Sequence, residues 1–260
     1  MRVDGVADRV HRKVDLAVQI LDDFTDLPIQ KGKVQVRIVS EDKPLIKSDG
    51  YYIFMNLKKT KLEVCITSAF YYPRMLALDL KQYSDNPPLV KVRMVPNRTY
   101  PVPYGTTCMQ GTAESGSLIR IICQDKAKTV KLLYEYERPK QGEYSKIHIY
   151  NPENMELEGR WFFITNKEKK AGEYFSISGT KAEEPGTYLL AQPLKENYKK
   201  IGTSIYPVYT GQADEKGKFF FLLEENSLKT CQYICEALGS KVIRKEYEVL
   251  SGKMNEINLL

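Results

Sequence analysis

The strongest constraint on the fold is a period-two alternation of apolar and polar residues that recurs in short segments. In the segment GKVQVRIV (32–39), the apolar residues Val34, Val36 and Ile38 alternate with charged or amide side chains. Alternation of this kind places the apolar residues on one face of a β-strand. A strand that is apolar on one face must bury that face against a second layer, so the pattern predicts β-sandwiches.

The same pattern extends over the whole chain, with breaks at Gly, Pro, Asn and charged residues. Further strands are predicted in VDLAVQIL (14–21), SDGYYIFMNL (48–57), KLEVCITS (61–68), LVKVRMVP (89–96), LIRIICQD (118–125), TVKLLYEYE (129–137), SKIHIYN (145–151), GRWFFITN (159–166), GEYFSIS (172–178), GTYLLAQPL (186–194), KFFFLLEE (218–225) and KVIRKEYEVL (241–250). Asp49 and Gly50 are predicted to form a structural turn before an aromatic strand, because Gly tolerates positive φ.

One segment favours a helix instead. In SLKTCQYICEALGSK (227–241) the apolar residues recur at helical spacing, and Gly239 stands where a helix would end. The residues at this spacing are Leu228, Cys231, Ile234, Cys235 and Leu238. We therefore expect an all-β protein of two immunoglobulin-like or transthyretin-like sandwich domains with one short helix near the C-terminus.

The length of 260 residues favours two domains, because single cores rarely grow to that size. Pro96, Pro101 and Pro103 mark a stiff, extended segment between two strand-rich regions. We expect an N-terminal arm at 1–12, a first sandwich at 13–95, a Pro-rich linker at 96–116 and a second sandwich at 117–260. The Pro-rich segment is equally compatible with an edge strand.

Charge and hydropathy predict a protein without a membrane span. The 39 basic and 33 acidic residues are spread along the chain, which indicates a solvated surface rather than a phosphate-binding stripe. Lysine clusters at 58–61, 167–170 and 195–200 coincide with expected turns, with nucleic-acid contact as the alternative. The N-terminal residues lack the apolar core of a signal peptide, and no run approaches the roughly 20 apolar residues of a membrane helix. A cytoplasmic location, or an assembly built in the cytoplasm, is the expectation.

The cysteines are odd in number and lie mostly in apolar segments. Five thiols of this kind indicate reduced, buried side chains rather than a disulfide framework. Cys231 and Cys235 are four residues apart, so on a helix they would share a face and could form a metal or redox pair. No second Cys or His pair completes a tetrahedral metal site.

Residues 14–80 contain an ordered set of segments: DLAVQILDDFTDLPI, then VQVRIV, then KSDGYYIFMNL. This set resembles the carboxypeptidase regulatory-like, or transthyretin-like, sandwich family, whose turn-and-strand signature is similar to Asp49-Gly50-Tyr51 followed by Phe54 and Leu57. The family's Gly-x-Tyr strand has no counterpart in LKKTKLEVCIT (57–67). The resemblance implies a non-catalytic sandwich module. Together with VRMVPNRTYPVPYGTT (92–107), the domain also looks like accessory proteins of phage-tail-like contractile assemblies in bacteria.

No catalytic constellation is visible in the sequence. The only histidines are His11, in the charged N-terminal stretch, and His148, on the expected solvent face of a strand. The phosphate-binding and dinucleotide-binding glycine motifs are missing. Asp22, Asp23 and Asp26 form one acidic cluster, which is either a solvated turn or a calcium site. We expect a non-enzyme without cofactor or metal.

Tyrosines near predicted loops are the best candidates for binding. Tyr71, Tyr72, Tyr100 and Tyr104 flank turns and the Pro-rich segment, and aromatic residues concentrate binding energy at interfaces. The alternative is that these rings anchor the loops to the core. The sequence thus favours a structural or adaptor protein that docks on a larger assembly through these tyrosines and an inter-domain groove. A glycan- or peptide-binding module is the second hypothesis, and an enzyme with an unrecognised site is the third.

Overall fold

The computed structural model describes residues 13–39, 41, 43–83, 87–125, 128–140, 143, 145–152, 155–167, 172–180, 184–224 and 229–260. Over these residues the chain is all-β, as predicted, with nineteen strands in four sheets and one short 3-10 turn, η1 (Leu80–Gln82). The arm predicted at 1–12, including His11, lies outside the described residues. None of the described residues forms a helix long and apolar enough to span a bilayer.

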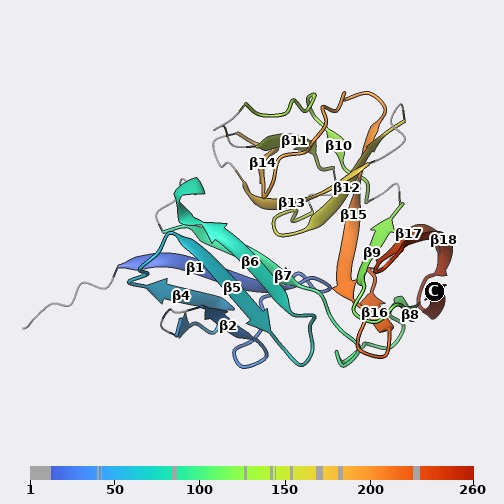
Figure 1. The fold of residues 1–260 in the computed structure, drawn as a ribbon, viewed down its shortest axis with the longest axis horizontal. Helices are drawn as coiled ribbons and strands as arrows, with labels where there is room; N and C mark the ends of the chain where they lie inside the picture. The colour runs from blue at the N-terminus through green and yellow to red at the C-terminus, as the bar shows by residue number, and fades with distance from the viewer. Residues whose placement is uncertain are drawn as a thin grey trace, which may run out of the picture.

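The N-terminal strands form a sandwich of two sheets, drawn in blue to teal in Figure 1. One sheet has the order β3-β4-β1-β7, with β1 at Val14–Asp22, β3 at Leu45–Ile46, β4 at Tyr51–Met55 and β7 at Leu89–Met94. The other has the order β2-β5-β6, with β2 at Gln35–Ile38, β5 at Lys61–Thr67 and β6 at Arg74–Asp79. We call this unit the N-terminal sandwich.

Alternation works in this sandwich as the sequence predicts. Val36 and Ile38 in β2 are buried while their neighbours are exposed, and Leu62, Val64 and Ile66 repeat the pattern in β5. These side chains join one core with the inward residues of β1, β4 and β7. Each sheet therefore buries one face, which is the arrangement that a period of two encodes.

The rest of the chain is organised around a nine-stranded sheet of order β10-β11-β14-β13-β12-β15-β9-β17-β18. Its strands are β9 (Leu118–Cys123), β10 (Lys131–Leu132), β11 (Lys146–Tyr150), β12 (Trp161–Asn166), β13 (Glu173–Thr180), β14 (Thr187–Leu190), β15 (Thr203–Gln212), β17 (Thr230–Leu238) and β18 (Val242–Leu250). A smaller sheet, β16-β8-β19, comprises β8 (Cys108–Ala113), β16 (Lys218–Leu222) and β19 (Met254–Leu259).

The nine-stranded sheet buries residues on both of its faces. On one face, Ile119, Ile121 and Tyr233 pack toward the β16-β8-β19 sheet, and a second core lies among β10 to β15. The opposite face carries another apolar group made of Ile122, Phe163, Val208, Ile234, Trp161, Tyr174 and Tyr206. We call this second side the aromatic face.

The helix predicted at 227–241 is wrong. Residues 230–238 form β17, which pairs with both β9 and β18, and Gly239 lies in the turn between β17 and β18. The five consecutive residues from Tyr233 to Ala237 are all buried, because one face of β17 packs toward the β16-β8-β19 sheet and the other belongs to the aromatic face. A strand that is buried on both faces has apolar residues at consecutive positions. Some of these residues are also three or four apart, which is the spacing that predicted a helix. Ser227 and Leu228 lie outside the described residues.

The segment predicted as a linker contains part of a sheet. Residues 108–113 form β8, the central strand between β16 and β19, while residues 101–107 contain no strand. The structure places several separate cores in the chain after residue 107. The division into two domains remains a prediction.

Candidate functional site

A groove separates the N-terminal sandwich from the aromatic face, and it is the candidate binding site. It has a volume of about 570 Å³, which falls within the range of ligand pockets in proteins. One wall consists of Tyr72, Pro73 and residues 74–77, and the other comes from β9, β12, β13 and β15. Their main members are Leu118, Trp161, Tyr174, Ser176, Thr210 and Gln212. We call it the inter-sheet groove.

Strand β6 borders this groove with its unpaired edge, since it is the last strand of the β2-β5-β6 sheet. The N–H of Leu80 donates to the carbonyl of Thr60 at 2.8 Å, and the antiparallel register continues this pairing to Leu78, Leu76 and Arg74. Backbone bonding alternates along antiparallel strands. Met75 and Ala77 therefore direct their N–H and C=O groups away from β5, toward the free edge.

Side chains on both sides of the groove are accessible. Met75 is 72% exposed, although large apolar side chains on strands are usually covered. Trp161 and Tyr174 are partly exposed on the aromatic face. These three side chains give the groove an apolar lining that solvent reaches.

Tyr174 is held in a fixed position at the margin of the groove. Its hydroxyl donates a hydrogen bond to Glu236, and the guanidinium of Arg120 lies 3.9 Å from its ring centroid. Burial and the bond to Glu236 raise the pKa of Tyr174 above its ordinary value. Arg244 also bonds Glu236, at 2.7 Å, so the carboxylate is shared between a tyrosine and an arginine. A ring fixed in this way loses little freedom on binding.

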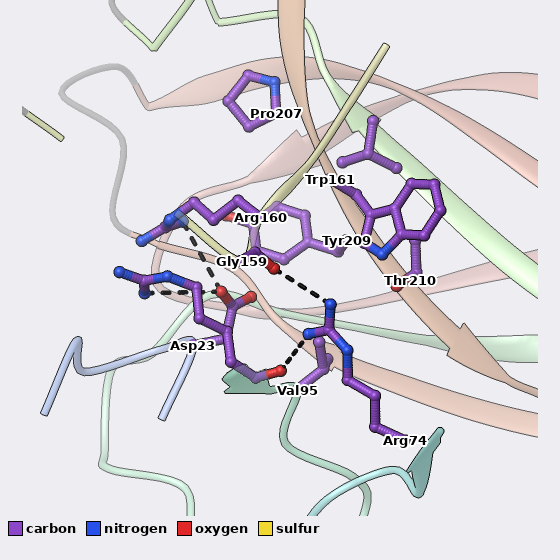
Figure 2. Close-up of a pocket in the computed structure, with 11 residues that line it drawn as sticks. Asp23, Arg74, Val95, Gly159, Arg160, Trp161, Pro207, Tyr209 and Thr210 are labelled. Carbon is purple, nitrogen blue, oxygen red and sulfur yellow. Dashed lines mark hydrogen bonds and ion pairs between the residues drawn. The ribbon is translucent and has the colours of Figure 1, made fainter. Parts of the chain in front are cut away.

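A charge cluster lies beneath the groove and joins the N-terminal sandwich to the nine-stranded sheet, and Figure 2 labels its members Asp23, Arg74 and Arg160. We use this name for Asp23, Asp26, Arg74, Arg93, Arg160 and Glu224. Arg93, only 1% exposed, bonds Asp26 and donates from Nε to the carbonyl of Glu158 at 3.0 Å. Arg160 reaches Asp26 at 2.9 Å and Glu224 at 2.7 Å.

Arg74 connects the same two units through backbone oxygens. Its guanidinium donates to the carbonyl of Arg93 at 2.5 Å and to the carbonyl of Gly159 at 3.2 Å. Figure 2 shows the contact between Arg74 and Gly159. Because β6, β7 and the segment before β12 meet at this one side chain, the wall and floor of the groove are linked directly.

The carboxylates of the cluster are affected differently by burial. Burial raises the pKa of Asp23, and the guanidiniums of Arg160 and Arg93 oppose this only in part, since they lie 4.0 and 3.9 Å away. Burial alone would also raise the pKa of Glu224, but Arg160 and Lys128 lower it below its ordinary value. The close ion pairs thus set the direction in which the pKa of each carboxylate moves.

The cavity inside the charge cluster is too small for a substrate. Its volume is about 20 Å³, which is room for roughly one water molecule. The charges of the cluster face one another, and in the described residues no group of acidic, His or Cys side chains could hold a metal ion. Asp23 and Asp26 therefore serve as ion-pair partners between units in this structure.

Of the tyrosines predicted to bind a partner, Tyr71 and Tyr100 pack against the protein. Both hydroxyls donate to Oδ2 of Asp22, at 2.8 and 2.7 Å, and the two rings meet edge to face. Asp22 also accepts a bond from the N–H of Phe24 at 2.8 Å. This acidic residue anchors the segment that follows β7.

The other two predicted tyrosines have different surroundings. Tyr72 lines the inter-sheet groove, and its hydroxyl both donates to the carbonyl of Phe220 at 2.9 Å and accepts from its N–H at 3.0 Å. Tyr104 is fully exposed in the segment before β8. The structure thus places only Tyr72 in the groove, and a binding role for Tyr104 stays a prediction.

The remaining sequence candidates lie outside the groove. Gly50, with φ +78°, forms the turn before β4, and Asp49 is exposed beside it. His148 lies in β11, where it bonds Thr187. None of the five cysteines forms a disulfide. The thiol of Cys231 donates to the carbonyl of Gln232 at 3.7 Å, and its interaction with Cys123 lowers the pKa of Cys123 and raises that of Cys231. Cys235 lies against Met109.

Sequence reasoning did not single out Trp161, Tyr174 or Met75. One signal was available: GRWFFITN and LIRIICQD contain consecutive apolar residues, which a strand with one buried face does not need. Consecutive apolar residues indicate that both faces of these strands contact other parts of the protein or a partner. They do not show which other segment lies opposite.

No protein-family model matches the sequence, and no curated protein matches it either. Among solved structures, the chain is similar to two mutants of the shaft pilin SpaA from Lactobacillus rhamnosus GG. The first has a TM-score of 0.24 at 11% identity, covering 95% of this chain and 97% of that chain. The second has a TM-score of 0.23 at 11% identity, covering 95% and 96%. Scores this low do not establish a common fold.

Proposed function

We propose that this chain is a non-catalytic docking protein, and that its inter-sheet groove binds an extended segment of a protein partner in a larger assembly. The observation that carries the proposal is the free edge of β6, which opens into a groove with Trp161 and Tyr174 on the opposite wall. An extended peptide can bond to such an edge through its backbone and place alternate side chains in the groove.

Backbone groups give the groove a means of recognising extended chain. Met75 and Ala77 offer N–H and C=O groups along the edge. A peptide paired with them would direct every second side chain toward Trp161 and Tyr174. Main-chain bonds would supply affinity, and the aromatic wall would select the side chains.

The groove is also already formed. Arg74 links both units, and the charge cluster beneath it holds Arg93 and Arg160 in several bonds. A site that does not rearrange on binding avoids the entropy cost of ordering its own walls. This rigidity supports a docking role.

The titratable groups of the groove favour binding over catalysis. Its described lining contains tyrosine and arginine but no His, Cys, Asp, Glu or Lys. General acid-base catalysis depends mainly on those residue types, and a serine, threonine or tyrosine hydroxyl needs one of them nearby as a base before it can act as a nucleophile. We therefore propose that no reaction takes place in this groove.

The setting of the proposed assembly is the cytoplasm. A phage-tail-like contractile injection assembly is a specific version of the proposal, and it rests on the sequence resemblance alone. Purification of the chain from its native cell together with tube or sheath proteins of such an assembly would support it. Recovery of the chain without them would contradict that version and leave the groove proposal intact.

The groove can be tested with a phage-displayed library of random linear peptides. Peptides enriched on the native chain should lose about thirtyfold in affinity on Trp161→Ala, the loss of one aromatic anchor. Tyr134→Ala, an exposed tyrosine outside the groove, is the matched control. Equal binding to the native chain and Trp161→Ala would show that the peptides bind elsewhere.

A second pair of variants tests the edge of β6. Met75→Pro removes an outward N–H without removing a bond to β5, whereas Met75→Thr keeps the N–H and changes only the side chain. We expect about a tenfold loss with proline and a smaller loss with threonine. Equal losses would show that the side chain, and not the backbone, makes the contact.

A saccharide is the second candidate ligand, because amide and hydroxyl groups line the groove beside Trp161. Gln192, Gln212 and Thr210 provide these groups. A sugar would stack on the indole ring and would not need the strand edge. On a glycan array, Trp161→Ala should abolish such a signal and Met75→Pro should preserve it, which is the opposite ranking to that expected for a peptide.

A further inference from the structure

Strand β18 forms a second, longer free edge. It spans nine residues, ends the nine-stranded sheet, and lies at the outer margin of the molecule in Figure 1. Long exposed edges readily pair with another strand, and proteins usually block them. Only the backbone groups of β18 that do not bond to β17 are available for such pairing.

The hydrogen-bonding register shows which backbone groups of β18 bond to β17 and which are free. The N–H of Ser251 donates to the carbonyl of Lys229 at 2.9 Å, and on the far side of β17 the N–H of Gln124 donates to Gln232 at 3.0 Å. Because bonding alternates, odd-numbered residues of β18 bond to β17 and even-numbered residues face the free edge. The outward-facing residues are Val242, Arg244, Glu246, Glu248 and Leu250.

One end of this edge is closed by the chain itself. Asn255 accepts a bond from the N–H of Leu250 at 2.9 Å and donates to its carbonyl at 3.0 Å. Among the described residues, no comparable side chain caps the other four outward-facing residues, which are Val242, Arg244, Glu246 and Glu248. The available edge is therefore a defined segment with Lys245 at its centre.

The neighbouring edge of β19 is blocked. Tyr247 donates to the carbonyl of Asn258 at 2.6 Å, and Lys245 donates to the same oxygen at 2.9 Å. These side chains of β18 occupy backbone groups that β19 would otherwise present. Side chains of the same chain thus occupy backbone groups of β19, whereas the outward backbone groups in the central part of β18 have no such partner among the described residues.

We propose that two copies of this chain pair through β18, antiparallel, about a two-fold axis at Lys245. In this register Arg244 lies opposite Glu246 of the second copy, and Val242 lies opposite Glu248 of the second copy. Each of the four uncapped residues then bonds with a residue of the other chain. The two nine-stranded sheets become one continuous sheet with an isologous interface.

The charged side chains of β18 favour a second copy of the chain as the partner, and they favour this register. Opposite charges directly across an antiparallel pair are favourable, and this register makes the Arg244–Glu246 pair twice, once on each side of the axis. An axis at Glu246 would place two glutamates opposite each other and would require the capped Leu250 to pair. Lys245 meets its own copy at the axis, but its ammonium is turned to Asn258 and Leu260 of its own chain.

The test is the molar mass of the full chain, measured by light scattering and sedimentation over a range of concentrations. The native chain should form a dimer. Glu246→Pro should be monomeric, because it removes an outward N–H while leaving the β17–β18 bonds intact. Glu246 makes no hydrogen bond or ion pair within the described structure, so its replacement should not affect folding, and circular dichroism checks this.

A charge exchange makes the register itself falsifiable. Glu246→Arg and Arg244→Glu should each weaken the homodimer, because like charges then meet twice. Mixed together, the two variants should form a heterodimer in which both opposite-charge pairs are restored. A native chain that is monomeric at every concentration, a dimeric Glu246→Pro, or a mixture that fails to associate would overturn the proposal.

Discussion

The N-terminal sandwich and the nine-stranded sheet are built from the same kind of strand but differ in how many faces they bury. In the sandwich, Val64 and Ile66 face a single core while Glu63 is exposed. In the nine-stranded sheet, Tyr233 and Ile234 are adjacent in sequence and lie in different apolar groups on opposite faces. A sheet that carries apolar side chains on both faces can therefore provide a core on one face and the wall of a groove on the other.

The charge cluster is where the two regions meet, so its removal should have the largest effect. Arg93→Met leaves the buried Asp23 and the half-exposed Asp26 without one of their cations, and we expect a loss of about 3 kcal/mol, the lower end of the range for breaking a buried ion pair. We expect the native chain to unfold in one thermal transition and Arg93→Met to unfold in two, because the units uncouple. Calorimetry measures this, with Arg37→Met, an exposed arginine on β2, as the control. One unchanged transition would mean that the cluster does not couple the regions.

The second prediction disturbs the nine-stranded region alone. A Cβ at Gly111, in the middle of β8, would lie 2.3 Å from the backbone oxygen of Ile257 and 2.7 Å from the ring of Phe219. Gly111→Ala should therefore destabilise this region by about 3 kcal/mol, since the β8–β19 pairing must shift. Chemical denaturation measures the loss, and Thr112→Ala is the neighbouring control. A loss below that of the control would contradict the close approach.

The third prediction disturbs the sandwich alone. Gly50 has φ +78°, and a Cβ there would lie 3.0 Å from the carbonyl oxygen of Ile20. Gly50→Val should cost about 1 to 3 kcal/mol, less than Gly111→Ala, because the turn has more room to adjust. Asp49→Ala, in the same turn, should change little. An unchanged melting midpoint for Gly50→Val would contradict the strained conformation.

The smallest effects concern the tyrosines near the Pro-rich segment. Tyr71 and Tyr100 both have pKa values above 10.0, because burial and their bonds to Asp22 disfavour the phenolate. The unfolded chain therefore loses these protons first, so stability should fall as the pH rises above about 10. Tyr100→Phe should cost about 1 kcal/mol at neutral pH and make this alkaline loss shallower.

Tyr104 provides the matched control, because it is fully exposed in the same segment. Tyr104→Ser should change stability by no more than about 0.5 kcal/mol and leave the alkaline loss as it is. Urea denaturation at several pH values measures both variants. Equal behaviour of Tyr100→Phe and Tyr104→Ser would show that the bond between Tyr100 and Asp22 contributes nothing.

Strand positions in the sandwich were predictable because one buried face gives a strict alternation, as in Val36 and Ile38. The same reasoning failed at β17, where Tyr233 to Ala237 are all buried and the pattern has no period of its own. The role of Asp23 was also out of reach. Its partners Arg93 and Arg160 are far along the chain, and nothing in the DDFTD segment indicates them.

The all-β class, the turn residues and the alternation of side chains could be predicted from the sequence, since they depend on neighbours a few residues apart. The tertiary structure alone forms the inter-sheet groove, because Met75, Trp161 and Gln212 come from three separate strands. It likewise decided that β18 ends a sheet, which depends on which strands pair and not on the composition of β18. A local pattern predicts which faces of a strand are buried. A site between strands depends on how distant segments pack, which no local pattern encodes.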